Sequence, residues 1–534
     1  MSSRILPPGI PRAMLWTGIA ASAALSILLL VTRIEALPGQ VADAPAALLL
    51  VLALLVGILL SRWEGCGRFL DAMVRPRNLL LVSLAALVIL AAGSYLVFGT
   101  VPLSTDEQTN LFQARLFAQF KITASYPPEL ISRIIPAGYQ NFDILVAPDG
   151  RAMAVTWPGW ALLMTPFVWI GAPWLLGPVM ASLGLYVLGR LAALFANAQA
   201  AAVAVLLAVT SGSFVVTGMS IYPSGGFLTL NLLYAWLLLT GGRRNALLAG
   251  LVGGLALNLA NPVPHALFAL PWVAWLALDR GRRSRLFWMA IGYSPWLVVS
   301  VLWLLATSSL HAGTSGSAGN FWLDRLPAFV SIPTLYIVGE RFWELVRLWV
   351  WSAPGLLVLA VVAWRRQPRM SGAWILGVAF GLTVLLYVLF PVDQGLGWGA
   401  RYYQGAWGAL PILAGILLVG PGADELRRIA VAAALAGLVL VVPLEVAYAY
   451  QTTQAARVDD SSLGALAAQG GDVCFIDYQI TDRATLPFAD DQSLRGRLVF
   501  ISFGPASDQA LVDRWFPGAR LVTSTSSGSC YLRP

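Results

Sequence analysis

The chain has 534 residues, of which 58% are hydrophobic and only 11% are charged, and its mean hydropathy is +0.74. Soluble domains carry about 25% charged residues, so this composition excludes an ordinary soluble protein and predicts a polytopic α-helical membrane protein. The net charge of +8 could indicate a nucleic-acid partner, but the arginines lie mainly in short connections between apolar stretches, so we expect no nucleic acid.

Apolar stretches that could cross a bilayer follow one another along most of the chain. A span needs roughly 20 apolar residues, and by this measure about thirteen stretches are predicted to be transmembrane helices. They lie near 14–32, 44–61, 79–99, 172–195, 198–217, 220–240, 245–262, 264–278, 286–308, 345–364, 371–390, 405–420 and 429–449. The first is longer than the apolar part of a signal peptide, so we expect it to remain as a span. The piece 159–170 is too short to span and is interpreted as half-buried or interfacial.

Arginines occur in alternate connections between these stretches. With the N-terminus in the cytoplasm, the inner connections contain Arg62, Arg68, Arg75 and Arg77; Arg243 and Arg244; Arg280, Arg282, Arg283 and Arg285; Arg365, Arg366 and Arg369; and Arg427 and Arg428. Connections rich in Lys and Arg stay on the cytoplasmic side. The sequence therefore predicts an integral protein of a bacterial plasma (inner) membrane. It places three segments outside: 100–157, 309–344 and the tail from 450 onward.

Two adjacent acids, Asp106 and Glu107, stand in "VPLSTDEQTNLFQARLF" (101–117), directly after the third predicted span. Ser104 or Thr105, followed three positions later by Glu107 or Gln108, is the pattern of a capping box at a helix start. The helix that follows alternates apolar and polar residues, so we expect it to lie along the membrane interface. Capping explains Glu107 better than Asp106, and a chemical role for the pair stays open.

Other polar residues are predicted to gather at the outer ends of the spans. They are Tyr222 and Ser224, Asn261 and His265, Glu445, and Asp393, Arg401 and Tyr402 in "PVDQGLGWGARYYQGAW". Polar groups are costly in hydrocarbon, so their gathering at one boundary predicts a site there. His265 could instead be a packed hairpin residue. Arg401 and Lys121, the only lysine of the chain, could instead anchor their segments at lipid headgroups.

The tail has a different composition from the rest of the chain. "GDVCFIDYQI" and "GRLVFISFG" are predicted strands, "SDQALVDRWF" a helix, and "ARLVTSTSSGSCYL" a further extended piece. This pattern predicts a small extracytoplasmic α/β domain over 451–534, after a transmembrane module over 1–450. Cys474 and Cys530 both fall in this outer domain, where a disulfide can persist, or they could be two separately buried thiols.

Three stretches in order resemble the C-type membrane glycosyltransferases, and among them the protein O-mannosyltransferase and lipid A aminoarabinose transferase group. The first is the acidic pair in the first large outer loop. The second, "DGRAMAVTWPGWALLMTPFVWIGAPWLLGP", is similar to that group's "DGR…YPPGWPLLLA" stretch. The third, "GWGARYYQGAWGALPIL", is similar to its "GPRYxxxALPxL" stretch. The tail also resembles the small terminal domain of some bacterial members, so the resemblance covers residues 100 to 525.

The resemblance implies an inverting transfer of a sugar from a polyprenyl-phosphate donor to an acceptor hydroxyl of a glycan, lipid or protein at the outer face. It implies that Asp106 is the general base and that Glu107 orients the acceptor or Asp106. Arg401 matches the arginine of the third stretch and is expected to bind the lipid phosphate, with Lys121 as a second cation. The further expected substrate-binding residues are Tyr402, Asp393, His265, Tyr222 and Trp157.

The sequence also departs from that group's pattern. Asn261-Pro262 stands where relatives often have a basic residue before proline, and Trp157-Pro158-Gly159 stands where they read "YPPG". One expected phosphate contact is therefore missing. We expect no tightly held metal, although Asp106 and Glu107 could share Mg²⁺ or Mn²⁺ with Asp393 or a lipid phosphate. The chain has two histidines and no P-loop or HExxH motif.

The alternative function is transport or flipping of a lipid or a lipid-linked glycan. Transporters commonly contain internal repeats and bind their substrates near the bilayer midplane. Here no repeat is found and the charged residues are predicted at the outer boundary, which favours an enzyme. A non-catalytic assembly or sensor protein that uses the outer tail is a third possibility.

Overall fold

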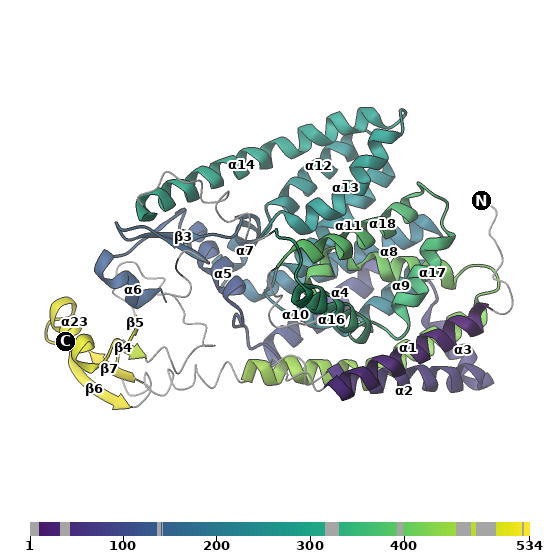
Figure 1. Ribbon diagram of the computed structural model, residues 1–534, viewed down its shortest axis with the longest axis horizontal. Helices are drawn as coiled ribbons and strands as arrows, with labels where there is room; N and C mark the ends of the chain where they lie inside the picture. Colours follow the sequence, from purple (N-terminus) through teal and green to yellow (C-terminus); the bar gives the residue numbers. More distant parts are fainter. Residues whose placement is uncertain are drawn as a thin grey trace. The chain divides into compact units, whose positions relative to one another are not determined.

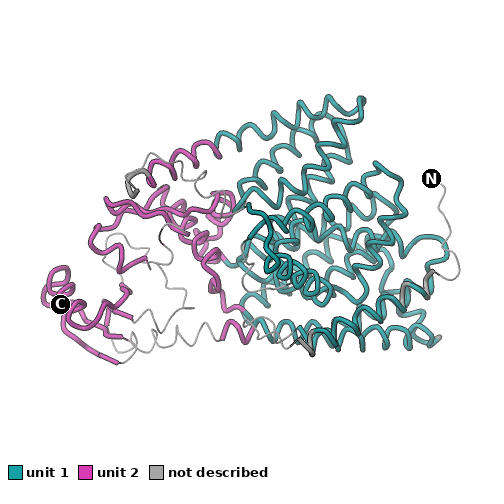
Figure 2. Tube along the Cα trace, in the orientation of Figure 1, with its two compact units in different colours: residues 1–97, 174–299, 325–449 teal, residues 98–173, 300–324, 450–534 magenta. Residues whose placement is uncertain are grey.

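The computed structural model describes residues 10–32, 43–135, 140, 143–315, 330–391, 399–454, 471–476, 498–525 and 528–534. The chain divides into two compact units (Figure 2). The first unit comprises 1–97, 174–299 and 325–449, and the second comprises 98–173, 300–324 and 450–534. Each unit is described by itself below.

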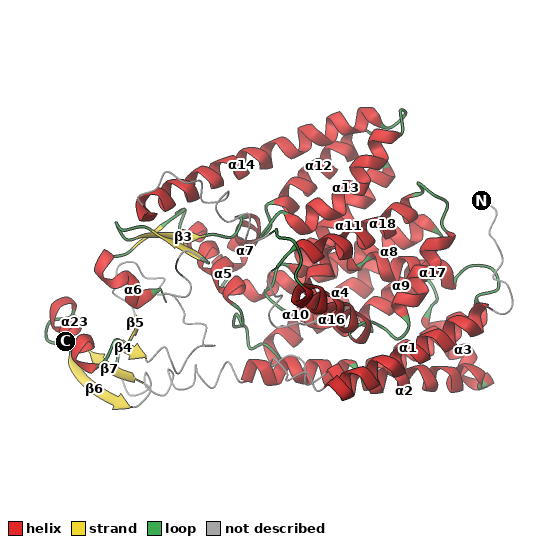
Figure 3. Ribbon diagram, in the orientation of Figure 1, coloured by secondary structure: helices red, strands yellow, loops and turns green. Residues whose placement is uncertain are grey.

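The regular structure of the first unit is helical throughout its described residues (Figures 1 and 3). Its α-helices are α1 Ile10–Thr32, α2 Asp43–Arg62, α3 Glu64–Met73, α4 Leu79–Leu96, α8 Leu176–Phe195, α9 Ala198–Val209, α10 Gly212–Met219, α11 Ser224–Thr240, α12 Arg243–Leu257, α13 Val263–Leu278, α16 Leu335–Val350, α17 Leu356–Arg366, α18 Gly372–Leu386, α19 Gln404–Trp407, α20 Ala409–Leu418 and α21 Asp424–Leu440, while α14 Arg283–Ser315 starts in this unit. Short 3₁₀ turns are η2 Pro173–Leu175, η3 Tyr387–Leu389 and η4 Arg401–Tyr403.

Six helical segments of the described residues are long and apolar enough to cross a membrane. They are Asp43–Arg62, Leu79–Leu96, Pro173–Phe195, Arg283–His311, Gly372–Leu389 and Asp424–Gln454. The bent pair α9 and α10 could be a seventh. A polytopic helical protein is therefore confirmed, but the count of about thirteen spans is not. Several predicted spans coincide with shorter apolar helices, such as α13 with 16 residues and α20 with 10.

Close backbone packing joins α12 and α14. A Cβ atom on Gly250 would lie 2.0 Å from the carbonyl oxygen of Met289, and one on Gly292 would lie 2.1 Å from that of Leu247. No larger residue fits at either position without moving a backbone. Small residues that let two helices approach in this way are typical of helix pairs in membranes.

The predicted span 345–364 is wrong, because the chain forms two helices there. Helix α16 ends at Val350 and α17 begins at Leu356. Pro354 has no N–H to donate, and Gly355 has φ +77, a left-handed conformation that side chains other than glycine disfavour. Hydropathy averaged over a span-length window changes little with one proline and one glycine. The apolar stretch in the sequence therefore extends across the break between the two helices.

A second break separates α9 from α10, which meet at 69°, and the two breaks bond to each other. The Ser211 hydroxyl accepts a hydrogen bond from the Ala353 N–H at 2.8 Å. The Ser213 N–H donates to the Trp351 carbonyl at 2.9 Å. Backbone groups that leave a helix in apolar surroundings need such partners, because no water replaces them.

The second unit combines short helices with two sheets. Its elements are α5 Thr105–Ala118, β1 Ala124–Ser125, η1 Pro128–Leu130, α6 Ile131–Ile134, β2 Ile144–Val146, β3 Arg151–Ala154, α7 Gly159–Trp169, β4 Val473–Ile476, β5 Leu498–Ile501, α23 Pro505–Trp515, β6 Arg520–Thr525 and β7 Gly528–Leu532. One sheet has the order β1-β3-β2 and is antiparallel. The other has the order β5-β4-β7-β6, in which only β4 and β5 are parallel.

The described residues of the tail pack with the segment 98–173 and not by themselves. The predicted boundary at 450 coincides with a boundary between the units, but the second unit also contains 98–173. Phe112, Leu116 and Ile134 of that segment share one hydrophobic core with Phe475 and Phe500 of the tail. Cys474 and Cys530 face each other on β4 and β7 and are joined by a disulfide.

Candidate active site

Glu107 forms the capping box at the start of α5. The Ser104 hydroxyl accepts a hydrogen bond from the Glu107 N–H at 3.3 Å. In return, Oε2 of Glu107 accepts from the N–H of Leu103 at 2.6 Å and from that of Ser104 at 3.2 Å. The capping interpretation is confirmed for Ser104 and Glu107. A carboxylate committed to two backbone donors is poorly suited to take a proton from a substrate.

Asp106 lies in the same first turn but outside the capping box. It is half-buried, and its backbone carbonyl accepts a hydrogen bond from Nδ2 of Asn110 at 2.7 Å. A negative charge in the first turn interacts favourably with the partial positive charge of the helix N-terminus. Of the acidic pair, Asp106 is therefore the residue whose side chain the cap does not use.

Helix α5 is largely buried within the second unit, on its polar as well as its apolar positions. Nine of its residues are buried, and these include Gln108, Thr109, Asn110 and Gln113. Gln113 donates to the Ile122 carbonyl at 2.9 Å and accepts from the Ala154 N–H at 3.0 Å. These bonds fix α5 against β3 and account for the burial of the Gln113 amide.

Two more of the predicted residues lie just after α5 and just before α7 in the chain. Lys121 follows α5 and is exposed, and Phe120 before it has φ +58. Trp157 is half-buried between β3 and the start of α7. Asp106, Glu107, Lys121 and Trp157 thus all belong to the second unit.

A second group of predicted residues meets in the first unit around the turn η4. Cζ of Arg401 lies 4.3 Å from the ring centroid of Tyr222 and 5.7 Å from that of Tyr402. Arginine over an aromatic face is a favourable contact that also fixes the plane of the guanidinium. The chain enters this turn through Ala400, whose φ of +56 is unusual for a residue with a side chain. Asp393, predicted nearby, lies outside the described residues.

His265 is fully buried and belongs to a polar network of the helical unit. Its Nδ1 lies 2.7 Å from Oδ1 of Asn231, and its Nε2 lies 2.7 Å from the Tyr293 hydroxyl. Asn231 also donates to the Gly405 carbonyl at 2.8 Å. With both ring nitrogens engaged, the geometry favours the packed residue over a substrate ligand.

Arg341 and Glu344, which are not among the residues expected from the sequence, form a buried ion pair on α16. Arg341 also donates from Nε to the Tyr387 carbonyl at 3.0 Å and from Nη2 to the Phe390 carbonyl at 2.6 Å. Its Cζ lies 5.3 Å from the Tyr402 ring centroid. The available signal was two opposite charges three positions apart in the apolar segment "LYIVGERFWELVRLWV".

Metal ligands do not gather within the described ranges, where no three His, Cys, Asp or Glu side chains lie close enough to hold an ion together. Asp393, one of the ligands considered, is outside those ranges. The expectation of no tightly held metal therefore stays a prediction.

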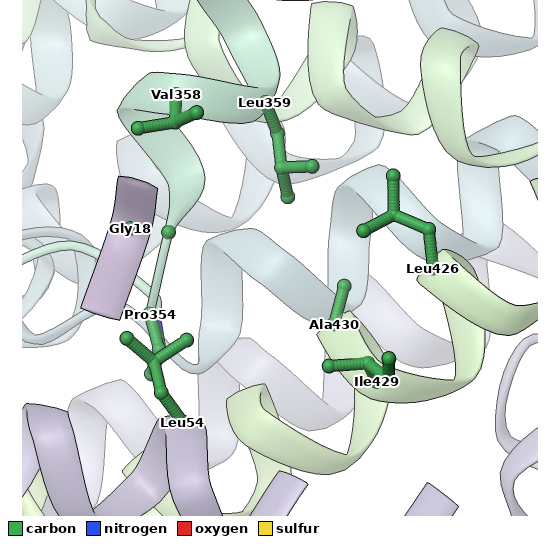
Figure 4. A pocket seen from close by; sticks show the side chains of 9 residues that line it. Gly18, Leu54, Pro354, Val358, Leu359, Leu426, Ile429 and Ala430 are labelled. Carbon is green, nitrogen blue, oxygen red and sulfur yellow. The ribbon is translucent and has the colours of Figure 1, made fainter. Parts of the chain in front are cut away.

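An apolar pocket opens in the first unit (Figure 4). It is lined by Gly18, Leu54, Pro354, Gly355, Val358, Leu359, Leu426, Ile429 and Ala430. None of these side chains can donate or accept a proton or hold a phosphate. The pocket is therefore not where group-transfer chemistry would occur.

Solved structures with the same fold are known. The chain matches ArnT from Cupriavidus metallidurans bound to undecaprenyl phosphate with a TM-score of 0.57 and 14% identity, over 84% of this chain and 97% of that one. The apo state of that protein matches with a TM-score of 0.55 and 15% identity, over the same shares. No protein-family model and no curated protein matches the chain. The polytopic helical fold that the resemblance implies is thereby confirmed, and at 14–15% identity the match shows the fold alone.

Proposed function

We propose that this protein is an inverting glycosyltransferase that moves a sugar from a polyprenyl-phosphate donor to an acceptor hydroxyl at the outer face of a bacterial plasma membrane. The observation that carries the proposal is the fold shared, over most of both chains, with a protein solved with undecaprenyl phosphate bound. The acid at the start of α5 and the arginine of η4 supply the two chemical groups that this reaction needs.

Asp106 is the proposed general base. A hydroxyl is a poor nucleophile until its proton is removed, and a carboxylate within about 3 Å can take that proton as the attack proceeds. The rigid first turn of α5 keeps this carboxylate in place, because Ser104 and Glu107 close the helix start around it. Glu107 therefore contributes by orienting Asp106 and not by touching the reacting atoms.

Arg401 is the proposed partner of the lipid phosphate. Charge grows on the phosphate as the glycosidic bond breaks, and a fixed cation stabilises that charge in the transition state. A guanidinium can bind phosphate through two parallel hydrogen bonds. The contact with the Tyr222 ring limits the orientations that the Arg401 guanidinium can take.

The test is transfer of a labelled sugar by the purified full chain in lipid. A panel of radiolabelled polyprenyl-phosphate sugars is offered with a crude envelope extract as acceptor. Wild type is compared with Asp106→Asn and with Asp513→Asn, an exposed aspartate of α23 in the same unit. Transfer by wild type and Asp513→Asn, but not by Asp106→Asn, is expected. Transfer by all three would remove the base role from Asp106. Transport of a donor across vesicle membranes without transfer would favour the flippase.

A further inference from the structure

The ion pair of Arg341 and Glu344 is the feature that the proposed reaction does not yet use. Both residues are buried, with exposed fractions of 3% and 1%, in a helix whose other residues are mostly apolar. Burying two charges is unfavourable unless their partners compensate fully, and a hydrophobic pair often serves stability as well or better. The pair therefore calls for an account beyond stability.

Arg341 closes the carboxyl end of a neighbouring helix. Its two backbone acceptors, Tyr387 and Phe390, lie in and directly after η3, which follows α18. The last carbonyl groups of a helix have no partner within the helix and need an outside donor. Glu344 binds Nη1, the remaining nitrogen of the same guanidinium, so both side chains hold the end of α18 in one position.

The closed end of α18 positions the ring of Tyr402. The rings of Tyr387 and Tyr402 are stacked, with centroids 5.0 Å apart and an interplanar angle of 7°. Phe390 meets the same Tyr402 ring edge to face at 5.5 Å and 85°. The two residues whose carbonyls Arg341 binds are thus the two whose rings contact Tyr402.

Arg401 is the neighbour of Tyr402 in the chain and in space. Its guanidinium carbon lies 5.7 Å from the Tyr402 ring and 4.3 Å from the Tyr222 ring. A continuous series of contacts therefore runs from Glu344 through Arg341, Tyr387 and Tyr402 to Arg401. All of its members belong to the first unit.

We propose that Arg341 and Glu344 are a positioning pair that fixes Arg401 for binding a polyprenyl phosphate. This inference rests on the proposed function, since it assumes the phosphate role of Arg401. The Arg341 guanidinium is already bonded to two carbonyls and to Glu344, so it acts through Tyr402 and not as a phosphate ligand. Preorganised groups of this kind raise affinity because the cation is not ordered at the moment of binding.

A second buried ion pair on the same helix provides the matched control. Arg347 pairs with Asp43 at 3.2 Å, and Asp43 also accepts from the Trp351 indole at 2.9 Å. This pair joins α16 to α2, whereas Arg341 joins α16 to η3. Loss of either arginine leaves a buried acid without its partner, so the two variants share the general cost.

The experiment measures the affinity of purified full-length protein for undecaprenyl phosphate, with thermal unfolding of each variant in parallel. Arg341→Gln and Arg401→Gln are expected to weaken binding about tenfold, and Arg347→Gln less than about twofold. Arg341→Lys is expected to recover part of the loss. In Arg341→Gln/Arg401→Gln the two losses should not add, because the first acts through the second.

The outcomes separate the inference from the proposed function. If Arg401→Gln weakens binding but Arg341→Gln behaves like Arg347→Gln, the positioning pair is refuted and the proposed function stands. If wild type fails to bind, or Arg401→Gln binds as wild type does, the phosphate role itself fails and the inference fails with it. Should Arg341→Gln not fold, Tyr402→Leu breaks the same series without touching the ion pair. A Tyr402→Leu variant that binds as wild type does would also overturn the inference.

Discussion

The side chains of Ser104 and Glu107 each accept a hydrogen bond from the backbone of the other residue. The Ser104 hydroxyl accepts from the Glu107 N–H, and the Glu107 carboxylate accepts from the Ser104 N–H. This reciprocal pair sets the first turn of α5, in which Asp106 lies. The two adjacent acids of the sequence therefore have different structural positions, and the difference can be measured.

Glu107→Gln should keep both stability and transfer, because an amide oxygen can still accept from the Leu103 and Ser104 N–H groups. Glu107→Ala removes the acceptor and should lower the free energy of unfolding by about 1 kcal/mol. Thermal unfolding and sugar transfer, measured on both variants, check this. Equal loss of transfer in Glu107→Gln and Asp106→Asn would mean that Glu107 takes part in the chemistry.

Glu445→Gln should be as stable as wild type or more so. Glu445 is fully buried, and neither carboxylate oxygen has a hydrogen-bond partner among the described residues. An unpaired buried charge is unfavourable, so its removal costs nothing. Asp43→Asn is the contrasting change and should cost about 3 kcal/mol, since it leaves Arg347 unpaired. Thermal unfolding in one detergent ranks the variants, and a large loss in Glu445→Gln would reveal a partner for the charged form.

Arg133→Gln should loosen the tail. Arg133 is buried and donates to Asp508 at 2.5 Å, to the Ile501 carbonyl at 2.8 Å and to the Ser507 hydroxyl at 2.6 Å. Its removal leaves Asp508 buried without its cation, at a cost of about 3–5 kcal/mol. Limited proteolysis should then cut within 498–525 sooner than in wild type. Arg514→Gln, which loses only an exposed pair with Glu129, should be cut at the wild-type rate.

Reduction of the disulfide between Cys474 and Cys530 should destabilise the tail. The bond joins two residues with a sequence separation of 56. Such a cross-link restricts the unfolded chain and thereby raises the free energy of unfolding by about 2–4 kcal/mol. Cys474→Ser/Cys530→Ser should unfold at a lower temperature, and reductant should change wild type but not this variant. A wild type that is insensitive to reductant would contradict the prediction.

Acid should remove the contribution that Asp472 makes to the stability of the folded protein. Burial raises the pKa of Asp472, but hydrogen bonds from Arg533, one of them at 2.9 Å, outweigh burial and hold the pKa below 3.8. A depressed carboxyl pKa contributes stability above the unfolded value, and this is lost as pH falls through the folded value. Asp472→Asn should therefore have a lower unfolding temperature than wild type at neutral pH. The difference between the two unfolding temperatures should disappear in strong acid.

The sequence predicted local features well and contacts between distant segments poorly. The capping box follows from residues three positions apart, and the tail strands follow from short apolar runs. The burial of α5 depends on Gln113 meeting Ala154, 41 positions away, and the role of Arg341 depends on carbonyls 46 and 49 positions away. Neither distance can be inferred from one sequence. The break before Gly355 was visible as Pro354-Gly355 but was averaged into an apolar stretch.

The bonds between the two helix breaks also bear on the order of biosynthesis. Ser211 and Ser213 are made long before Trp351 and Ala353, and the sequence separation between Ser211 and Ala353 is 142 residues. Until the ribosome reaches the later segment, the Ser213 N–H lacks its carbonyl and the Ser211 hydroxyl lacks its donor. The α9–α10 bend is therefore completed only after much of the membrane part has been inserted, and a nascent chain that stops before residue 351 cannot close it.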